Sequence, residues 1–243
     1  MDELQQRVAA YFASRPFTIE KEEATTGDLV FRVRIRACVP DDLGAVIGDV
    51  IHNARAALDL IIWQAVLANG GTPGKPSCFP ITKDAPSYQK TRSTALAGAS
   101  ADVFTLVDRL QPYAGGNDAL WRLHSLDILD KHRVLVPVGA AYRQFILNVE
   151  LPKIPGMPEG CKVPPIAIRP ADRQFPLQDG DAVFAICAAA RGTSHGFEDP
   201  QFRFEIAFGD GQVVDGEPVF GVLEAVVKEV ERVTDLFERA IFK

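Results

Sequence analysis

A chain of 243 residues with 47% hydrophobic and 24% charged residues can bury a sizeable core and has an ordinary globular composition. Its formal net charge of −6 argues against a broad electrostatic surface for nucleic acid or anionic membrane, but a local basic groove stays compatible with it. No apolar run approaches roughly 18 residues and the chain starts with Asp2-Glu3, so we expect no membrane span and no export signal.

The four cysteines are widely spaced and include no C-x-x-C pair. They are Cys38, Cys78, Cys161 and Cys187. Together with the expected lack of an export signal, this spacing favours reduced, mostly buried thiols in a cytoplasmic protein.

The first 39 residues predict a short helix and a β-hairpin. Apolar residues recur on one side of residues 2–14, a helical pattern that ends before Pro16. Residues 17–23 and 29–39 have the character of two strands, and the second alternates apolar residues with arginines. Three arginines on one strand face would suit nucleic acid. Glutamates on the partner strand are the simpler counterpart, since opposite charges across strands are mildly stabilising.

Residues 41–68 form the longest helical pattern in the chain. Apolar residues recur there at three- and four-residue steps, the period of one helical face. Asp41-Asp42 suits a helix N-terminus and Asn69-Gly70-Gly71 suits its end. Leu60 and Trp63 lie on outer sectors, so we expect a core helix that is covered on more than one side.

This helix carries a polar cluster, His52, Arg55 and Asp59, at the border of its apolar face. The three side chains fall within about 60° on a helical wheel at ~100° per residue. Isolated buried charge is costly, so Arg55 and Asp59, four residues apart, are expected to pair if they are covered. The cluster can be a structural polar seam, a ligand or catalytic site, or plain exposed surface.

A second helix, at residues 117–131, repeats this arrangement. His124, Asp127 and Lys131 have the same three- and seven-residue offsets and lie within an apolar arc. Because two helices each carry a histidine with charged partners at one spacing, we expect His52 to lie near the second group. The Gly70–Ser77 stretch between the helices lacks the glycine spacing of a phosphate-binding P-loop and predicts a plain loop.

The remaining patterns complete an α+β fold, a helical bundle with an antiparallel β-rich insertion before the C-terminal helix. A polar stretch at 82–94 precedes a helix at 100–110, and a long amphipathic helix spans 218–242. Strands are predicted at 134–138, 142–151, 163–169, 182–189 and 201–208, joined by turns such as 152–158. We expect a single domain over 1–243, with the bundle at 41–133 and 218–242, the β-rich part at 134–210, and the N-terminal helix and hairpin at 1–39.

Two blocks of the sequence resemble a family of bacterial proteins that is common in actinobacteria. The first is the GDVIHNARAALD segment at 48–59, and the second is LHSLDILDKHR at 123–133. The resemblance covers roughly residues 15–140. It implies family membership rather than a function, because no activity is established for that family.

A bundle with His, Asn, Arg and Asp at these positions is also similar to HEPN-type helical domains of bacterial defence and toxin systems. Some of those are metal-independent RNases in which an Arg is followed, after four to six residues, by a His. Here the order differs, since His52 precedes Arg55. Arg122 also lies too close to His124 and too far from His132 for that motif.

One hypothesis for function is an enzyme that hydrolyses a phosphate-bearing ligand or cleaves RNA. His52 and His124 would be acid–base groups, oriented by Asp59 and Asp127, because histidine titrates near neutrality and a carboxylate fixes its tautomer. Arg55 and Lys131 would bind an anion such as phosphate. A metal variant on the two histidines and two aspartates suits zinc, manganese or iron, but the adjacent cations oppose it. We therefore expect no metal and no cofactor.

The alternative is a non-enzymatic binding or interaction module, in which the cluster is a structural polar seam and a homo-oligomer or partner surface carries the function. The loop at 193–196 contains His195, which is expected to be solvated. Neither Ser125 nor Ser194 has the G-x-S-x-G context of a nucleophile elbow, so nucleophilic catalysis is not expected. The sequence leaves open whether the protein is an enzyme.

Overall fold

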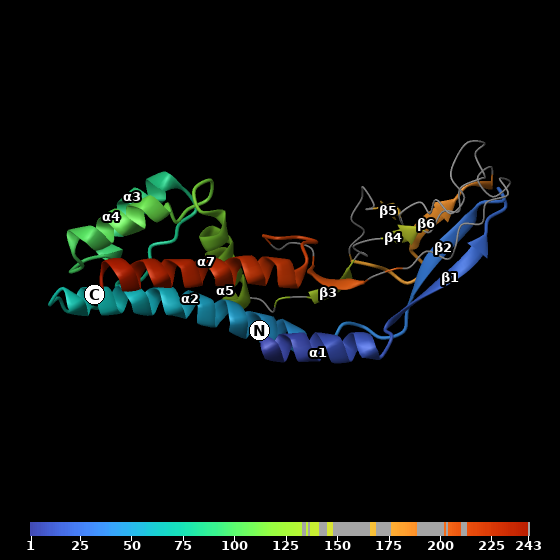
Figure 1. Ribbon diagram of the computed structural model, residues 1–243, viewed down its shortest axis with the longest axis horizontal. Helices are drawn as coiled ribbons and strands as arrows, with labels where there is room; N and C mark the ends of the chain where they lie inside the picture. The colour runs from blue at the N-terminus through green and yellow to red at the C-terminus, as the bar shows by residue number, and fades with distance from the viewer. Residues whose placement is uncertain are drawn as a thin grey trace, which may run out of the picture. The chain divides into compact units, whose positions relative to one another are not determined.

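The computed structural model describes residues 1–132, 135, 137–140, 145–147, 166–168, 176–188, 202, 204–209 and 213–242. The chain divides into two compact units. Unit 1 comprises Met1, Gly44–Leu135 and Gly211–Lys243, and unit 2 comprises Asp2–Leu43 and Val136–Asp210. The fold is α+β, with the β-rich segment inserted before the last helix, as the sequence predicted (Figure 1). That the two units form a single domain stays a prediction.

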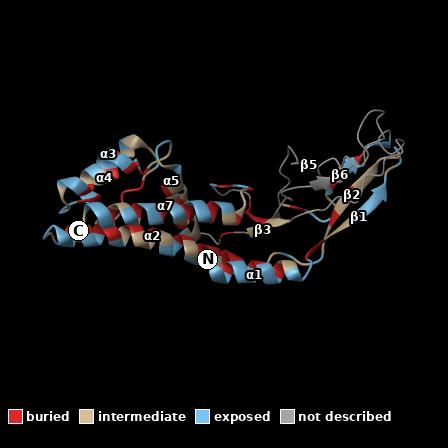
Figure 2. Cartoon of the chain, in the orientation of Figure 1, coloured by how far each residue is buried: buried red, intermediate tan, exposed pale blue. Residues whose placement is uncertain are grey.

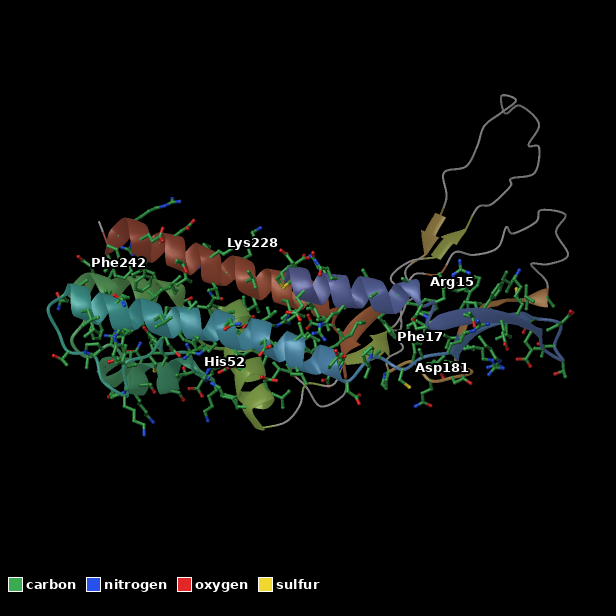
Figure 3. All side chains as sticks on the ribbon, turned by 90° about the horizontal axis from the view of Figure 1, so that it is seen from below. Arg15, Phe17, His52, Asp181, Lys228 and Phe242 are labelled. Carbon is green, nitrogen blue, oxygen red and sulfur yellow. The ribbon has the colours of Figure 1, made fainter. Side chains whose placement is uncertain are left out.

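Unit 1 is helical. Its elements are α2 (Asp42–Ala68), α3 (Ala85–Ala95), α4 (Ala101–Leu110), α5 (Asp118–His132) and α7 (Val219–Ala240). The long helices α2 and α7 lie side by side (Figures 1 and 3). Buried residues recur along both at helical spacing, as expected for amphipathic helices that pack on one side (Figure 2). The helices predicted at 41–68, 100–110, 117–131 and 218–242 are all present, and apart from the first two residues of α2 they lie in this one unit.

One surface of α2 is not covered, which corrects the expectation of a helix enclosed on more than one side. Leu60 is 61% exposed and Trp63 is 41% exposed. Leu67 follows on the same face at 46% exposure. Periodicity assigns these residues to a helix face, but it does not tell whether another element packs on that face.

Helix α3 was missed, because 82–94 has few apolar residues and predicted no regular structure. Its start is fixed by Asp84, whose carboxylate accepts a hydrogen bond from the Ser87 backbone N–H at 2.7 Å. Pro86 in the first turn needs no hydrogen-bond partner for its nitrogen. Tyr88 is buried and donates its hydroxyl to Asp108 of α4 at 2.6 Å. A cap and one buried aromatic residue thus specify this helix.

Unit 2 joins the N-terminus to the β-rich segment. It contains α1 (Asp2–Ala13) and an antiparallel sheet of β1 (Phe17–Glu23), β2 (Leu29–Ile35) and β6 (Ala182–Ile186) in the order β1-β2-β6. Arg32 pairs with Glu22 at 2.6 Å and Arg34 with Glu20 at 2.7 Å. The glutamates therefore pair with both arginines of β2, as expected, and the third arginine, Arg36, follows the end of this strand.

The other described strands of unit 2 form two separate pairs instead of the single sheet that was expected. β3 (Pro137–Ala140) pairs with β7 (Glu205–Phe208), and β4 (Phe145–Leu147) pairs with β5 (Ile166–Ile168), both antiparallel. Gly139 lets the Phe17 ring approach the backbone, since a Cβ there would lie 2.7 Å from it. The strand predicted at 134–138 is described at Pro137 and Val138, within β3, and residues 134 and 136 lie outside the described residues. The turn at 152–158 and the loop at 193–196 lie outside the described residues.

Cys38 and Cys187 are exposed and Cys78 is partly exposed. The expectation of mostly buried thiols is therefore wrong for this set, since Cys38 and Cys187 follow the ends of β2 and β6; Cys161 lies outside the described residues.

Among the residues that the structure describes, no helix has the length and apolar character needed to cross a membrane.

Candidate functional site

The six candidate residues lie where α2 and α5 meet. The contacts run in opposite order along the two helices: Gly48 faces the carboxyl of Asp130, and His52 contacts Asp127. Farther along, Arg55 acts electrostatically on His124. Figure 3 shows His52 on the side of α2 at which α5 lies. The expectation that His52 lies near the second polar group is confirmed.

The first part of this cluster is open to solvent. Nδ1 of His52 lies 3.2 Å from Oδ1 of Asp127, and Nζ of Lys131 donates to Oδ2 of Asp127 at 2.6 Å. The Asp127 side chain is only 3% exposed, whereas that of His52 is 58% exposed. A buried carboxylate at Nδ1 favours the tautomer with its proton on Nδ1, and this leaves Nε2 as the free acceptor. We call His52, Asp127 and Lys131 the open triad.

The second part is closed. Arg55, whose side chain is 8% exposed, donates to Oδ1 of Asp59 at 2.6 Å and to the Phe79 carbonyl oxygen at 2.9 Å. The Phe79 backbone N–H donates to the same Asp59 oxygen at 2.8 Å. The predicted Arg55–Asp59 interaction is confirmed, and its further partner is the buried segment after the 70–77 loop. The guanidinium is thus committed to internal hydrogen bonds.

His124 lies between the two parts. Its Nδ1 is buried and has no hydrogen-bond partner among the residues that the structure describes. Burial lowers the pKa of His124, and the positive charges of Arg55 and Lys131 lower it further, while Asp127 and Asp59 oppose them. The ring is therefore held in its neutral form near pH 7.

Asp130 is the residue of this contact that the sequence reasoning missed. Its carboxyl packs against Gly48, where a Cβ on α2 would lie 2.4 Å from Oδ1. Burial raises the pKa of Asp130, and the neighbouring Asp127 and Asp49 raise it further, against the opposing effects of His52 and Lys131. Two signals were present: Asp130 follows Asp127 by three residues, and a glycine precedes His52 by four.

The four residues of the metal alternative are divided between the two parts. Asp59 turns to Arg55 and Phe79, whereas His52 and Asp127 belong to the open triad. In the described part of the chain, no group of three or more His, Cys, Asp or Glu side chains is placed to hold a metal ion.

Comparison of the chain with family models, curated proteins and solved structures gives no match. The actinobacterial family and the HEPN similarity therefore stay predictions.

Proposed function

We propose that the open triad is a general acid–base centre that cleaves a phosphodiester, with RNA as the substrate class. The observation that carries this proposal is the buried Asp127 carboxylate at Nδ1 of a solvent-exposed His52. Such a carboxylate orients the imidazole and stabilises its protonated form during proton transfer. Nε2 is then the group that removes a proton from the substrate.

The charges around His52 limit which phosphate fits. Lys131 is half exposed and supplies a positive charge next to the imidazole. Asp49 and Asp130 lie close by and repel negative charge. A singly charged phosphodiester suits this setting better than a doubly charged phosphate monoester. Arg55 is not proposed as an anion ligand, because its side chain is only 8% exposed and donates to Asp59 and to the Phe79 carbonyl oxygen.

A second candidate, the structural polar seam of an interaction module, is favoured by the closed part of the cluster. Arg55 and Asp59 link the middle of α2 to Phe79, after the 70–77 loop, through two hydrogen bonds, and a third joins the two side chains to each other. This network fixes the segment without a ligand. The proposal therefore assigns a structural role to Arg55 and Asp59 and a chemical role to His52.

Two alanine variants on one helix separate these roles. His52→Ala is expected to lower the rate of RNA cleavage by roughly 10²–10⁴-fold, the usual contribution of a general base. Its cost to the free energy of unfolding is expected to be about 1 kcal/mol or less, because water replaces the exposed ring. Arg55→Ala is expected to cost more, about 1–3 kcal/mol, because the buried carbonyl oxygen of Phe79 loses its donor. Cleavage of a labelled RNA oligonucleotide and urea unfolding give the two readouts.

Gln64→Ala serves as the control, since Gln64 is an exposed residue of α2 away from the cluster. It is expected to change neither readout. An unchanged cleavage rate in His52→Ala, or wild-type protein without activity on RNA, contradicts the proposal. Loss of stability in His52→Ala as large as in Arg55→Ala would leave the polar seam as the account of the whole cluster.

A further inference from the structure

Asp130 is placed beside the open triad by a glycine. A side chain at position 48 would collide with its carboxyl group, because the Cβ would lie 2.4 Å from Oδ1 and 2.6 Å from Oδ2. Glycine inside a helix costs roughly 0.5–1 kcal/mol relative to alanine. At Gly48 the missing side chain leaves room for the carboxyl group of Asp130, on α5, to lie against the α2 backbone.

Gly48 and His52 are one turn apart on α2, a rise of about 6 Å at ~1.5 Å per residue. The Asp130 carboxyl at Gly48 and the His52 ring therefore flank the same stretch of the helix surface. Asp130 is partly exposed, so a ligand at His52 can reach it. The charged groups that face it are Asp49 and His52 from α2 and Asp127 and Lys131 from α5.

We infer that Asp130 is the second catalytic residue of this site, the general acid that complements His52, and that the substrate is a phosphodiester with a neighbouring hydroxyl group. This inference rests on the proposed function and adds a residue and a reaction type to it. The raised pKa of Asp130 agrees with an acid that keeps its proton in a larger fraction of molecules than an ordinary aspartate does.

The reaction that uses both groups is an internal transesterification. Nε2 of His52 takes the proton of the 2′-hydroxyl, and the 2′-oxygen forms a bond to phosphorus. The bond between phosphorus and the 5′-oxygen breaks, and Asp130 gives its proton to that leaving oxygen. The products are a 2′,3′-cyclic phosphate and a 5′-hydroxyl. His52 has gained one proton and Asp130 has lost one, so the proton count balances.

Protonated Asp130 also makes the site acceptable to an anion. In that form it removes one of the negative charges that surround His52, leaving Asp127, which Lys131 and His52 already contact, and the exposed Asp49. A singly charged diester can then approach Lys131. The same proton thus permits binding and is available to the leaving group.

The test compares two ribonucleotide substrates that differ only in their leaving group. One is a ribodinucleotide, whose 5′-alkoxide leaves poorly without a proton, and the other is a uridine 3′-(p-nitrophenyl phosphate), whose phenolate leaves well without one. Asp130→Asn is expected to lower kcat/KM on the dinucleotide by roughly 10²-fold or more and on the nitrophenyl ester by less than about fivefold. His52→Ala is expected to lose activity on both substrates, because the base is needed in each case.

Two further variants complete the experiment. Asp49→Asn removes the same charge near His52 without removing the acid, and it is expected to leave the ratio of the two activities unchanged. Gly48→Ala displaces the carboxyl without deleting it, and it is expected to shift the ratio in the same direction as Asp130→Asn. This second route also covers the case in which Asp130→Asn does not fold.

Each of the remaining outcomes contradicts one part of the inference. Equal losses on both substrates in Asp130→Asn give Asp130 a structural role, and full activity on both removes it from the reaction; either result leaves His52 and the proposed function intact. Equal cleavage of a 2′-deoxy dinucleotide overturns the internal transesterification. Wild-type protein that cleaves neither ribonucleotide overturns the inference together with the proposed function.

Discussion

At the α2–α5 contact, three titratable side chains within seven residues of α5 have three different environments. Asp127 is buried and contacts both His52 and Lys131. Asp130 lies near two other carboxylates and has a raised pKa, whereas His124 is half-buried near Arg55 and has a lowered pKa. Burial and charged neighbours therefore shift the pKa of Asp130 and the pKa of His124 in opposite directions, although both residues lie on one helix.

The lowered pKa of His124 predicts a pH dependence of stability. A basic group whose pKa is depressed by folding contributes stability that is present above its unfolded pKa, about 6.5. That stability is lost as the pH falls through the lower pKa of the folded state. His124→Leu removes this pH-dependent loss. The free energy of unfolding of the variant minus that of wild type is therefore expected to be larger at pH 5 than at pH 8.

Urea unfolding of both proteins at the two pH values measures this difference, and acid effects of other groups cancel in the comparison. His124→Leu takes no partner from a buried donor or acceptor in the described part of the chain, where the Nδ1 atom has none. A difference that stays constant with pH, or that changes in the opposite direction, would show that the folded protein does not hold this ring neutral.

Local spacing explains which parts of the site could be predicted. The Arg55–Asp59 pair follows from a four-residue step on one helix, and the closeness of His52 to Asp127 was expected from matching offsets on two helices. The Phe79 carbonyl and the Asp130 carboxyl were not predicted. One comes from a loop and the other depends on a glycine of another helix, and both are set by the relative placement of elements.

At the scale of elements, long amphipathic segments were predictable and short polar ones were not. The apolar periodicity of 41–68 and 218–242 correctly predicted α2 and α7. Helix α3 depends on an Asp84 cap and one buried tyrosine, a signal too short for periodicity. β6 pairs with the N-terminal hairpin, and this contact between distant parts of the sequence cannot be predicted from a local pattern.

The α2–α5 contact provides a test at this scale through Gly48. Alanine is the better helix former by about 0.5–1 kcal/mol, so Gly48→Ala would stabilise α2 if nothing lay against it. Asp130 does lie there, and its carboxyl has to move. We expect Gly48→Ala to be neutral or destabilising in the wild-type background and to stabilise by about 0.5–1 kcal/mol in Asp130→Ala.

A double-mutant cycle of unfolding free energies measures this coupling, which is expected to fall in the range of about 0.5–3 kcal/mol for residues in contact. Gly221→Ala in α7 is the matched control, because a Cβ there has ordinary contact distances and is independent of Asp130. Additive effects of the Gly48 and Asp130 substitutions would mean that the carboxyl does not pack against α2.

At the scale of the whole molecule, the chain passes repeatedly between the two compact units. Each unit is built from separate stretches of sequence, so neither can form from one continuous segment. Helix α2 begins at Asp42, within unit 2, and continues without interruption into unit 1. Because the segments of the two units alternate along the chain, we expect the two units to fold together.

We therefore expect the protein to unfold in one cooperative transition. Both tryptophans, Trp63 and Trp121, belong to unit 1, so their fluorescence reports on that unit alone. Phe31→Ala opens a cavity in the core of unit 2 and Leu58→Ala in that of unit 1. Such substitutions cost about 3–5 and 2–5 kcal/mol respectively.

In a cooperative molecule the cost of Phe31→Ala appears in the tryptophan signal, although the changed residue lies in the other unit. Urea unfolding followed by fluorescence is thus expected to show lower midpoints for both variants, coincident with the far-UV circular dichroism transition of each. Gln5→Ala, an exposed position of unit 2, is expected to change the free energy of unfolding by less than about 0.5 kcal/mol. A fluorescence midpoint that Phe31→Ala leaves unchanged, with an earlier transition by circular dichroism, would show that the two units unfold independently and that the single-domain prediction is wrong.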